Sequence, residues 1–181
     1  ELCHPLENIF VTQKFGGHPA YYKQYKYKDA YNNIKSSLGH SGIDFRCAVG
    51  TPVYAMHDGV IIKASGDNPA YGNQVRIQDG VNHYQTIYAH LSSMLVHCGQ
   101  TVLMGQLIGL SGKSGICDGP HLHASYRSNE TPYTNGYFGC TDFFPLFRYT
   151  VEEITKQRRE ARQGVKREVV KAYLKKYNFI K

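Results

Sequence analysis

The sequence has no apolar run that approaches the roughly 18 residues needed for a membrane-spanning helix, so nothing in it is predicted to cross a bilayer. It begins at Glu1 without an initiator methionine or a signal-peptide pattern, and we therefore expect a mature form or an excised domain. Hydrophobic residues make up 41% of the 181 positions, an ordinary share for a globular protein with a buried core. These features predict one small domain with an appendage.

Cysteine is scarce and lacks the spacing of a structural metal site. The five cysteines contain no CxxC pair, which argues against a structural zinc knuckle. Their odd number would leave one thiol free if disulfides formed, and the sequence leaves the pairing open. The cysteines are Cys3, Cys47, Cys98, Cys117 and Cys140.

The excess of basic over acidic residues lies almost entirely in one part of the chain. Residues 150–181 contain ten Lys/Arg and four Asp/Glu, a net charge of +6, whereas residues 1–149 carry a net charge of only +1. A basic segment of this kind can bind a polyanion, such as an anionic polymer of a bacterial wall or, less readily here, nucleic acid. It can equally be the solvated face of a helix.

Four histidines and one aspartate stand in three short, glycine-flanked motifs. The motifs are Gly39-His40-Ser41-Gly42-Ile43-Asp44-Phe45, Tyr88-Ala89-His90-Leu91 and Gly119-Pro120-His121-Leu122-His123. Side chains alternate along a strand with a period of two, so His121 and His123 can both reach one point. A catalytic zinc takes three ligands from His, Asp or Glu and keeps a fourth position for water. Together, the motifs predict a catalytic zinc site.

Short β-segments punctuated by glycine occupy most of the remaining sequence. Asp58-Gly59 leads into an apolar segment, Val75 and Ile77 alternate with polar residues, and Asp79-Gly80 precedes a second run, which predicts a hairpin. The pattern predicts an all-β fold.

At this point the stretch from Gly39 to about Arg127 resembles the M23 peptidases, the lysostaphin and LytM-like zinc metalloendopeptidases that cut peptide cross-links of bacterial peptidoglycan. The three motifs above carry the resemblance, and four further segments keep the same order. These segments are Gly50-Thr51-Pro52-Val53-Tyr54-Ala55, Asp58-Gly59-Val60, Tyr71-Gly72-Asn73 and Gly105-Gln106-Leu107-Ile108-Gly109. The resemblance implies a compact antiparallel β-sandwich of the lysostaphin/LytM (duplicated hybrid motif) type whose cleft holds the metal.

The resemblance also implies roles for individual residues. His40, Asp44 and His123 would bind Zn²⁺, and His90 and His121 would act on substrate and water as general base and oxyanion stabiliser, without a division between them. The sequence departs from the family after the HxH motif, where Ala124-Ser125 replaces an aromatic and an acid. This departure bears on substrate preference more than on metal binding.

Two other functions fit part of the pattern. One is a non-catalytic LytM-like domain that binds wall or activates an amidase, but such relatives typically lack the zinc residues. The other is a sugar phosphotransferase carrier domain, which shares a His-x-Gly-Ile-Asp stretch but needs no Gly-Pro-His-x-His. We therefore expect a peptidoglycan hydrolase acting outside the cell, in the periplasm or in the wall, either bacterial or a phage lytic or virion-associated enzyme.

Two regions flank or follow the motifs. Residues 18–38 interleave tyrosine with lysine without clear periodicity, and we interpret them as a long loop that forms one wall of the substrate groove or simply packs on the sheet. The predicted catalytic domain covers residues 1–149, and residues 150–181 form a basic helical segment that begins with a capping box at Thr150 and Glu153. Its apolar stripe predicts a helix, or a pair split at Gly164, packed on the β-domain. The stripe is Val151, Ile154, Ala161, Val165, Val169 and Tyr173.

Overall fold

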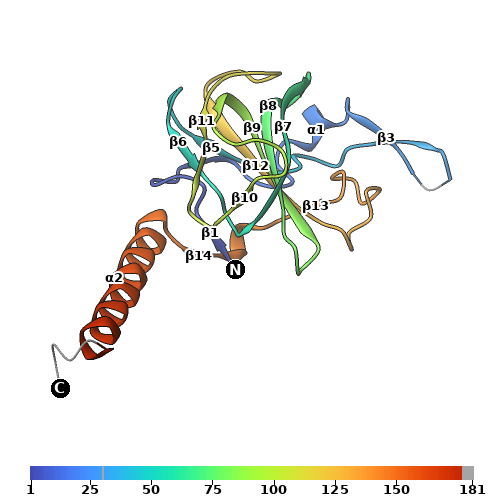
Figure 1. The fold of residues 1–181 in the computed structure, drawn as a ribbon. Coiled ribbons are helices and arrows are strands. Elements are labelled where there is room, and N and C mark those ends of the chain that lie inside the picture. Colours follow the sequence, from blue (N-terminus) through green and yellow to red (C-terminus); the bar gives the residue numbers. More distant parts are fainter. Residues whose placement is uncertain (30, 177–181) are drawn as a thin grey trace.

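Short strands make up most of the fold, and one long helix follows them (Figure 1). The computed structural model describes residues 1–29 and 31–176. The strands are β1 (Leu2–Cys3), β2 (Val11–Gln13), β3 (Lys26–Lys28), β4 (Ile34–Ser36), β5 (Ile43–Arg46), β6 (Pro52–Tyr54), β7 (Gly59–Asn68), β8 (Gly72–Gln78), β9 (Tyr84–Met94), β10 (Thr101–Val102), β11 (Leu107–Ser111), β12 (His121–Ser128), β13 (Cys140–Thr141) and β14 (Phe147–Tyr149). The helices are α1 (Pro19–Tyr22), the 3-10 helix η1 (Phe144–Leu146) and α2 (Val151–Lys176). The predicted all-β fold with a helical C-terminal appendage is confirmed.

The main sheet has the order β10-β7-β8-β9-β12-β5-β2, and every pair in it is antiparallel. Strand β11 also pairs with β9 and with β6, so β9 takes part in three ladders, with β8, β12 and β11. The predicted hairpin through Asp79-Gly80 is present as β8 and β9. Outside the main sheet, β1 and β14 form a parallel pair and β3 and β4 an antiparallel one.

The two faces of the central strands have different chemistry. On β12, Leu122 and Ala124 are buried in the hydrophobic core, and Leu122 stands opposite Phe45 of β5. The alternate residue His123 pairs with Asp44 instead and so lies on the other face. The period-two pattern of β12 thus separates the core from a polar face at the centre of the sheet.

Helix α2 begins at the capping box that the sequence predicts. The backbone N–H of Thr150 donates to Glu153 Oε2 over 2.7 Å, and the N–H of Glu153 donates to Thr150 Oγ1 over 3.2 Å. Val151 and Ile154 are buried and form a small cluster with Cys3. This first turn anchors the helix to the β-domain.

The remainder of the apolar stripe does not pack as predicted. Val165 is 66% exposed and Val169 is 63% exposed, and α2 extends away from the β-domain in Figure 1. The helix also continues through Gly164 rather than splitting there. The side chain of Tyr173, the last residue of the predicted stripe, is not among those that the structure describes. The prediction that the stripe packs on the β-domain was therefore wrong beyond the first turn, because only Val151 and Ile154 lie close enough to the β-domain to be buried. Among the described residues, no helix combines the length and apolar character that crossing a membrane requires.

The tyrosine- and lysine-rich segment contains more structure than the predicted loop. Helix α1 is a single turn that begins with Pro19, and β3 pairs with β4 in a short hairpin. Asp29 closes the turn of this hairpin by accepting hydrogen bonds from the backbone N–H groups of Tyr31 and Asn33. Strands of three residues are too short to leave a readable alternation, which is why the sequence pattern missed them.

Candidate metal centre and active site

The closest cluster of potential metal ligands lies where β5 and β12 run side by side. Asp44 on β5 stands opposite His123 on β12, and His40 lies three residues before β5 begins. Gly42 permits this approach, because a Cβ at that position would lie 2.4 Å from the carbonyl oxygen of Ala124 and 2.6 Å from His123 Cε1. Any larger residue at position 42 would therefore clash with β12.

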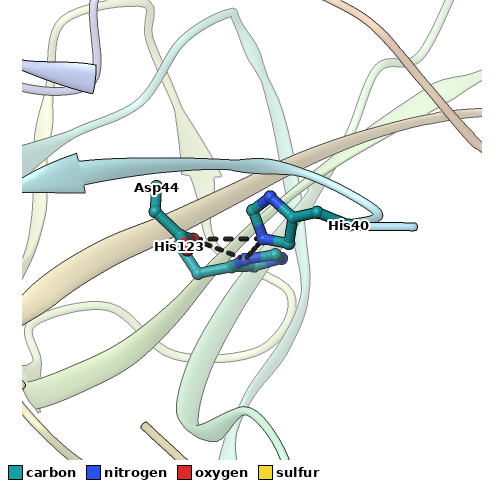
Figure 2. A group of neighbouring side chains, drawn as sticks. All are labelled: His40, Asp44 and His123. Atoms are coloured by element: carbon teal, nitrogen blue, oxygen red, sulfur yellow. Dashed lines mark hydrogen bonds and ion pairs between the residues drawn. The ribbon is translucent and has the colours of Figure 1, made fainter. Parts of the chain in front are cut away.

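Three donor atoms converge at this point (Figure 2). His40 Nε2 lies 2.9 Å from His123 Nδ1 and 3.2 Å from Asp44 Oδ1, and His123 Nδ1 lies 2.9 Å from the same oxygen. All three side chains are buried, and their ligand atoms lie within 4.8 Å of one another. Two imidazole nitrogens and one carboxylate oxygen are a donor set that fits zinc with an open fourth position.

The outward nitrogens of both imidazoles have their own partners. His40 Nδ1 lies 3.2 Å from the carbonyl oxygen of Lys14, which can only accept, so this nitrogen donates and Nε2 keeps its lone pair. His123 Nε2 lies 2.8 Å from Ser125 Oγ, a hydroxyl that can donate or accept. With Nδ1 as a metal ligand, Nε2–H of His123 donates to this oxygen. Such outer partners orient ligand histidines and select the tautomer that binds metal.

The charge of the site favours a bound cation. Burial acts to raise the pKa of Asp44, but the two adjacent imidazoles of His123 and His40 outweigh it and hold that pKa well below its usual range. Burial lowers the pKa of His123, while Asp44 opposes this effect. A charged carboxylate beside neutral imidazoles is the protonation state that a metal ion needs.

His90 and His121 lie beside this cluster without being part of it. Their ring centroids are 4.7 Å apart, and His121 Nε2 lies 3.7 Å from Asp44 Oδ1. His90 Nδ1 donates to the carbonyl of Ser114 over 2.8 Å, and His121 Nδ1 donates to the carbonyl of Gly119 over 2.9 Å. In the neutral form of either ring, the lone pair therefore resides on Nε2.

His90 has a left-handed backbone in the middle of β9, with φ of 61°. The ladder with β8 shifts register close by, and the N–H of His90 donates to the carbonyl of Tyr71 over 2.8 Å. A bulge of this kind turns a side chain out of the regular alternation. Burial, together with the neighbouring His123, lowers the pKa of His90 to about 4, so this ring is neutral at physiological pH.

Two cavities border the cluster and share His40, His90 and His123 among their walls. The first has a volume of about 340 Å³ and includes Arg76 and Arg127. The second has a volume of about 290 Å³, and its lining also includes Gln13, Asp44, Cys117, Asp118 and His121. His18, to which the motifs assign no role, lines it as well.

Tyrosines from residues 18–38 contribute to both cavities. Tyr21 and Tyr22 line the two cavities and Tyr25 lines the first. The Tyr22 ring lies 5.4 Å from the ring of His40, and Tyr22 Oη accepts a hydrogen bond from Gln13 over 3.1 Å. The predicted tyrosine wall therefore stands next to the candidate metal ligands.

Several site residues escaped the sequence reasoning. Ser125 and Arg127 continue the alternation that begins at His121 and His123, so the period of β12 could have indicated both. Arg76 comes from β8, and no local pattern places it near β12. The other histidines set aside by the motifs include His57, which is buried between the carbonyl of Asp58 and the hydroxyl of Thr86.

The structure shows no disulfide among its described residues. Within residues 1–29 and 31–176, all five cysteines are unpaired. Cys117, four residues before His121, lines the second cavity, and burial raises the pKa of its thiol. Cys3 and Cys140 are buried.

Known proteins share this arrangement of sequence and fold. Residues 38–135 match the model of peptidase family M23. The peptidoglycan DD-endopeptidase ShyA of Vibrio cholerae serotype O1 is 52% identical over 84 residues, which cover 46% of this chain and 19% of ShyA. The chain thus spans about a fifth of the length of this curated relative.

Two solved structures extend the similarity to the fold. A zinc containing peptidase from Vibrio cholerae superposes with a TM-score of 0.53 and 33% identity, covering 68% of this chain and 35% of that one. The antimicrobial peptidase lysostaphin from Staphylococcus simulans gives a TM-score of 0.55 and 32% identity, covering 68% of this chain and 47% of that one.

The family match contains all three sequence motifs, and the structural matches have the same β-fold. The predicted resemblance to lysostaphin-like proteins is thereby confirmed, and the sugar phosphotransferase carrier domain is not needed to explain the His-x-Gly-Ile-Asp stretch. On these grounds the chain belongs to peptidase family M23.

Proposed function

We propose that this chain is a zinc-dependent endopeptidase that hydrolyses peptide cross-links or stem peptides of bacterial peptidoglycan. The observation that carries the proposal is the convergence of His40 Nε2, Asp44 Oδ1 and His123 Nδ1 at the junction of two cavities. ShyA is a peptidoglycan endopeptidase by name, and a structural relative is a zinc peptidase, which supports both substrate and metal.

In this proposal His40, Asp44 and His123 hold the zinc ion through the three converging atoms. When bound, the ion acts as a Lewis acid and lowers the pKa of water to about 7. Lys14, through its carbonyl, and Ser125, through its hydroxyl, keep the two imidazoles in the orientation that presents their inner nitrogens.

His90 and His121 serve as the proton-handling groups. Nδ1–H of each ring donates a hydrogen bond to a backbone carbonyl, so the neutral ring presents an Nε2 lone pair that can accept a proton from the attacking water. The resulting imidazolium can stabilise the negative charge that develops on the carbonyl oxygen, and it can return the proton to the leaving amine. The structure gives no reason to divide these roles between the two residues.

The complete ligand set argues against the non-catalytic alternative. A domain that only binds wall or activates an amidase has no need for three buried, converging metal donors or for two further histidines with ordered tautomers.

Residues 1–149 form the catalytic unit in this proposal, and residues 150–181 form a separate basic segment. The excess positive charge of that segment makes anionic wall polymers a suitable partner. A peptidoglycan substrate places the enzyme in the periplasm, the wall or the medium, as a secreted and bacteriolytic bacterial enzyme or as a phage lytic or virion-associated one.

The decisive experiment combines metal analysis with wall digestion. We expect about one zinc ion per chain, loss of wall lysis on chelation and its return with added zinc. Mass spectrometry of the fragments identifies the new amino termini and so the bond that is cut. A His123→Ala variant is the matched control for contaminating hydrolases. Full activity in a preparation without metal would contradict the proposal.

A further inference from the structure

We propose that Arg76 and Arg127 form a carboxylate-binding subsite next to the metal ligands, so that the enzyme selects peptides with a free carboxylate close to the bond it cuts. The proposal rests on the proposed endopeptidase function and narrows its substrate class. It concerns the first cavity, of about 340 Å³, whose walls include both arginines and three of the site histidines.

Sheet register places the two arginines on the same face as the metal ligands. Arg76 on β8 stands opposite Ile87 on β9, and Ile87 stands opposite Ser125 on β12. Directly paired residues share a face, and residues two apart on a strand do as well. His123, Ser125, Arg127 and Arg76 therefore all extend from the polar face of the sheet.

Neither guanidinium group has a counter-ion in the part of the chain that the structure describes. Among the ion pairs of residues 1–29 and 31–176, none includes Arg76 or Arg127. Within the same residues, the buried Nε of Arg127 has no hydrogen-bond partner. Burial raises the pKa of the neighbouring Cys140 thiol despite the proximity of Arg127, so this thiol is uncharged and does not balance the arginine.

Neutral groups hold the two arginines in place. Arg76 Nε donates to Gln74 Oε1 over 2.8 Å, and its Cζ lies 5.9 Å from the centre of the Tyr71 ring. Arg127 Cζ lies 5.4 Å from the centre of the Tyr133 ring. Burial lowers the pKa of Arg76, which shows that its charge is poorly solvated. Half-buried cations that are oriented by aromatic rings but have no anion are suited to receive one from a ligand.

A carboxylate is the anion that this location favours. Guanidinium groups bind carboxylates through paired N–H donors, and these charge-assisted bonds are among the strongest in proteins. In a peptide substrate, the anion that can lie in the cavity while the scissile bond lies at the metal ligands is a carboxylate on a residue next to that bond. The second cavity is lined by Asp118 and, among the described residues, by no arginine, so positive charge lies on one side of the metal ligands and negative charge on the other.

Two sources of carboxylate satisfy this chemistry. One is the free carboxylate of a diamino acid whose amino group forms the cross-link, and the other is the terminal carboxylate of an uncross-linked stem peptide. A glycyl cross-bridge has neither beside the bond that is cut. The subsite therefore predicts cleavage at a D-Ala-to-diamino-acid link in preference to a Gly-Gly link.

The test compares soluble substrates that differ only in this group. We would measure kcat/KM of the zinc-loaded protein on a D-Ala-diaminopimelate cross-linked peptide, on the same peptide amidated at that carboxylate, on a stem peptide ending in D-Ala-D-Ala, and on pentaglycine. We expect the free acid to exceed its amide by about 10- to 100-fold, the range for a charge-assisted hydrogen bond. Efficient cleavage of D-Ala-D-Ala would identify the terminal carboxylate as a second ligand.

Variants assign the preference to the arginines. Arg76→Gln and Arg127→Gln should each lose most of the ratio of kcat/KM on the free acid to kcat/KM on the amide, and Arg127→Lys should restore part of that ratio. Zinc content should not change. Arg162→Gln on the exposed face of α2 is the matched control, because it removes the same charge far from the cavity.

The outcomes separate the subsite from the proposed function. Equal rates of wild type on acid and amide would overturn the subsite even if a variant failed to fold, and so would a variant that slows both substrates equally. Binding of the released diaminopimelate peptide and of its amide, measured by calorimetry, gives a readout without turnover, and equal affinities would overturn the subsite as well. Failure of the zinc-loaded wild type to cleave any peptide would instead refute the endopeptidase function.

Discussion

The centre of the β-sheet and helix α2 use polar residues in opposite ways. At the centre of the sheet, His40, Asp44 and His123 are buried and each has specific partners. Along α2, nearly all of the described side chains after Ile154 are exposed, and few of their charges have a partner among the described residues. The candidate catalytic groups are therefore buried and paired at the sheet, whereas most of the net positive charge belongs to the exposed C-terminal segment.

Removal of a metal ligand should give the largest difference between the two regions. Asp44→Ala or His123→Ala takes away one of three donors, and even the loss of an outer partner costs about 10- to 100-fold in metal affinity or activity. We therefore expect loss of zinc and a fall in activity of more than roughly 100-fold. Elemental analysis and peptide hydrolysis provide the measurements. Arg162→Ala on α2 should retain both, and a comparable loss there would contradict the separation.

Removal of a proton-handling histidine should affect turnover alone. His90→Ala and His121→Ala each leave the three metal donors intact, so zinc content should stay near one per chain. Activity should fall by about 10²-fold or more, the usual scale for acid-base or oxyanion groups. If His121→Ala lost zinc while His123→Ala retained it, the roles of the two histidines in the HxH motif would be reversed.

Loss of the Ser125 hydroxyl should have a smaller effect on the same site. Ser125→Ala removes the partner of His123 Nε2, so we expect zinc affinity to fall by roughly 10-fold, at the low end for an outer partner. Competition with a chelator of known affinity measures this change. Ser128→Ala, near the end of the same strand, is the control. Equal zinc affinity in both variants would show that the hydroxyl does not orient the ring.

Truncation of α2 should affect the enzyme least on a soluble substrate. A chain that ends at Gln157 keeps the buried first turn with Val151 and Ile154 and removes nine Lys/Arg and two Asp/Glu. Hydrolysis of a short peptide should be unchanged. Binding to intact wall should weaken several-fold at low salt and lose much of its salt dependence, because exposed charges are screened over about 8 Å at physiological ionic strength.

Co-sedimentation with purified wall across a salt series measures this effect. Identical binding curves for the full-length and shortened proteins would reject an electrostatic role for the helix. The charge on α2 would then be only its solvated face.

The sequence predicted the residues that local spacing controls. Alternation along a strand places His121 and His123 on one face. The first motif places His40 only four residues before Asp44. Neither inference needs the rest of the fold. The all-β class followed from the glycine-punctuated strands for the same reason. These are short-range properties, which a sequence records directly.

Long-range register could not be predicted in the same way. Arg76 reaches the site through the pairing of β8 with β9 and of β9 with β12, and a shift of one residue in either ladder would turn it to the other face. Likewise the carbonyls of Lys14 and Ser114 carry no side-chain signal. The helical period after Thr150 predicted a helix correctly, but whether an apolar stripe is covered depends on neighbours that the period does not reveal.

Tyr71 connects parts of the groove that an engineer would prefer to alter separately. Its carbonyl accepts the backbone N–H of His90, its ring lies 5.5 Å from the ring of His123, and Arg76 Cζ lies 5.9 Å from the centre of the same ring. A substitution at Arg76 therefore also changes the surroundings of a ring that lies against the proposed metal ligand His123. Libraries that vary Arg76 to change substrate preference should keep Tyr71 fixed.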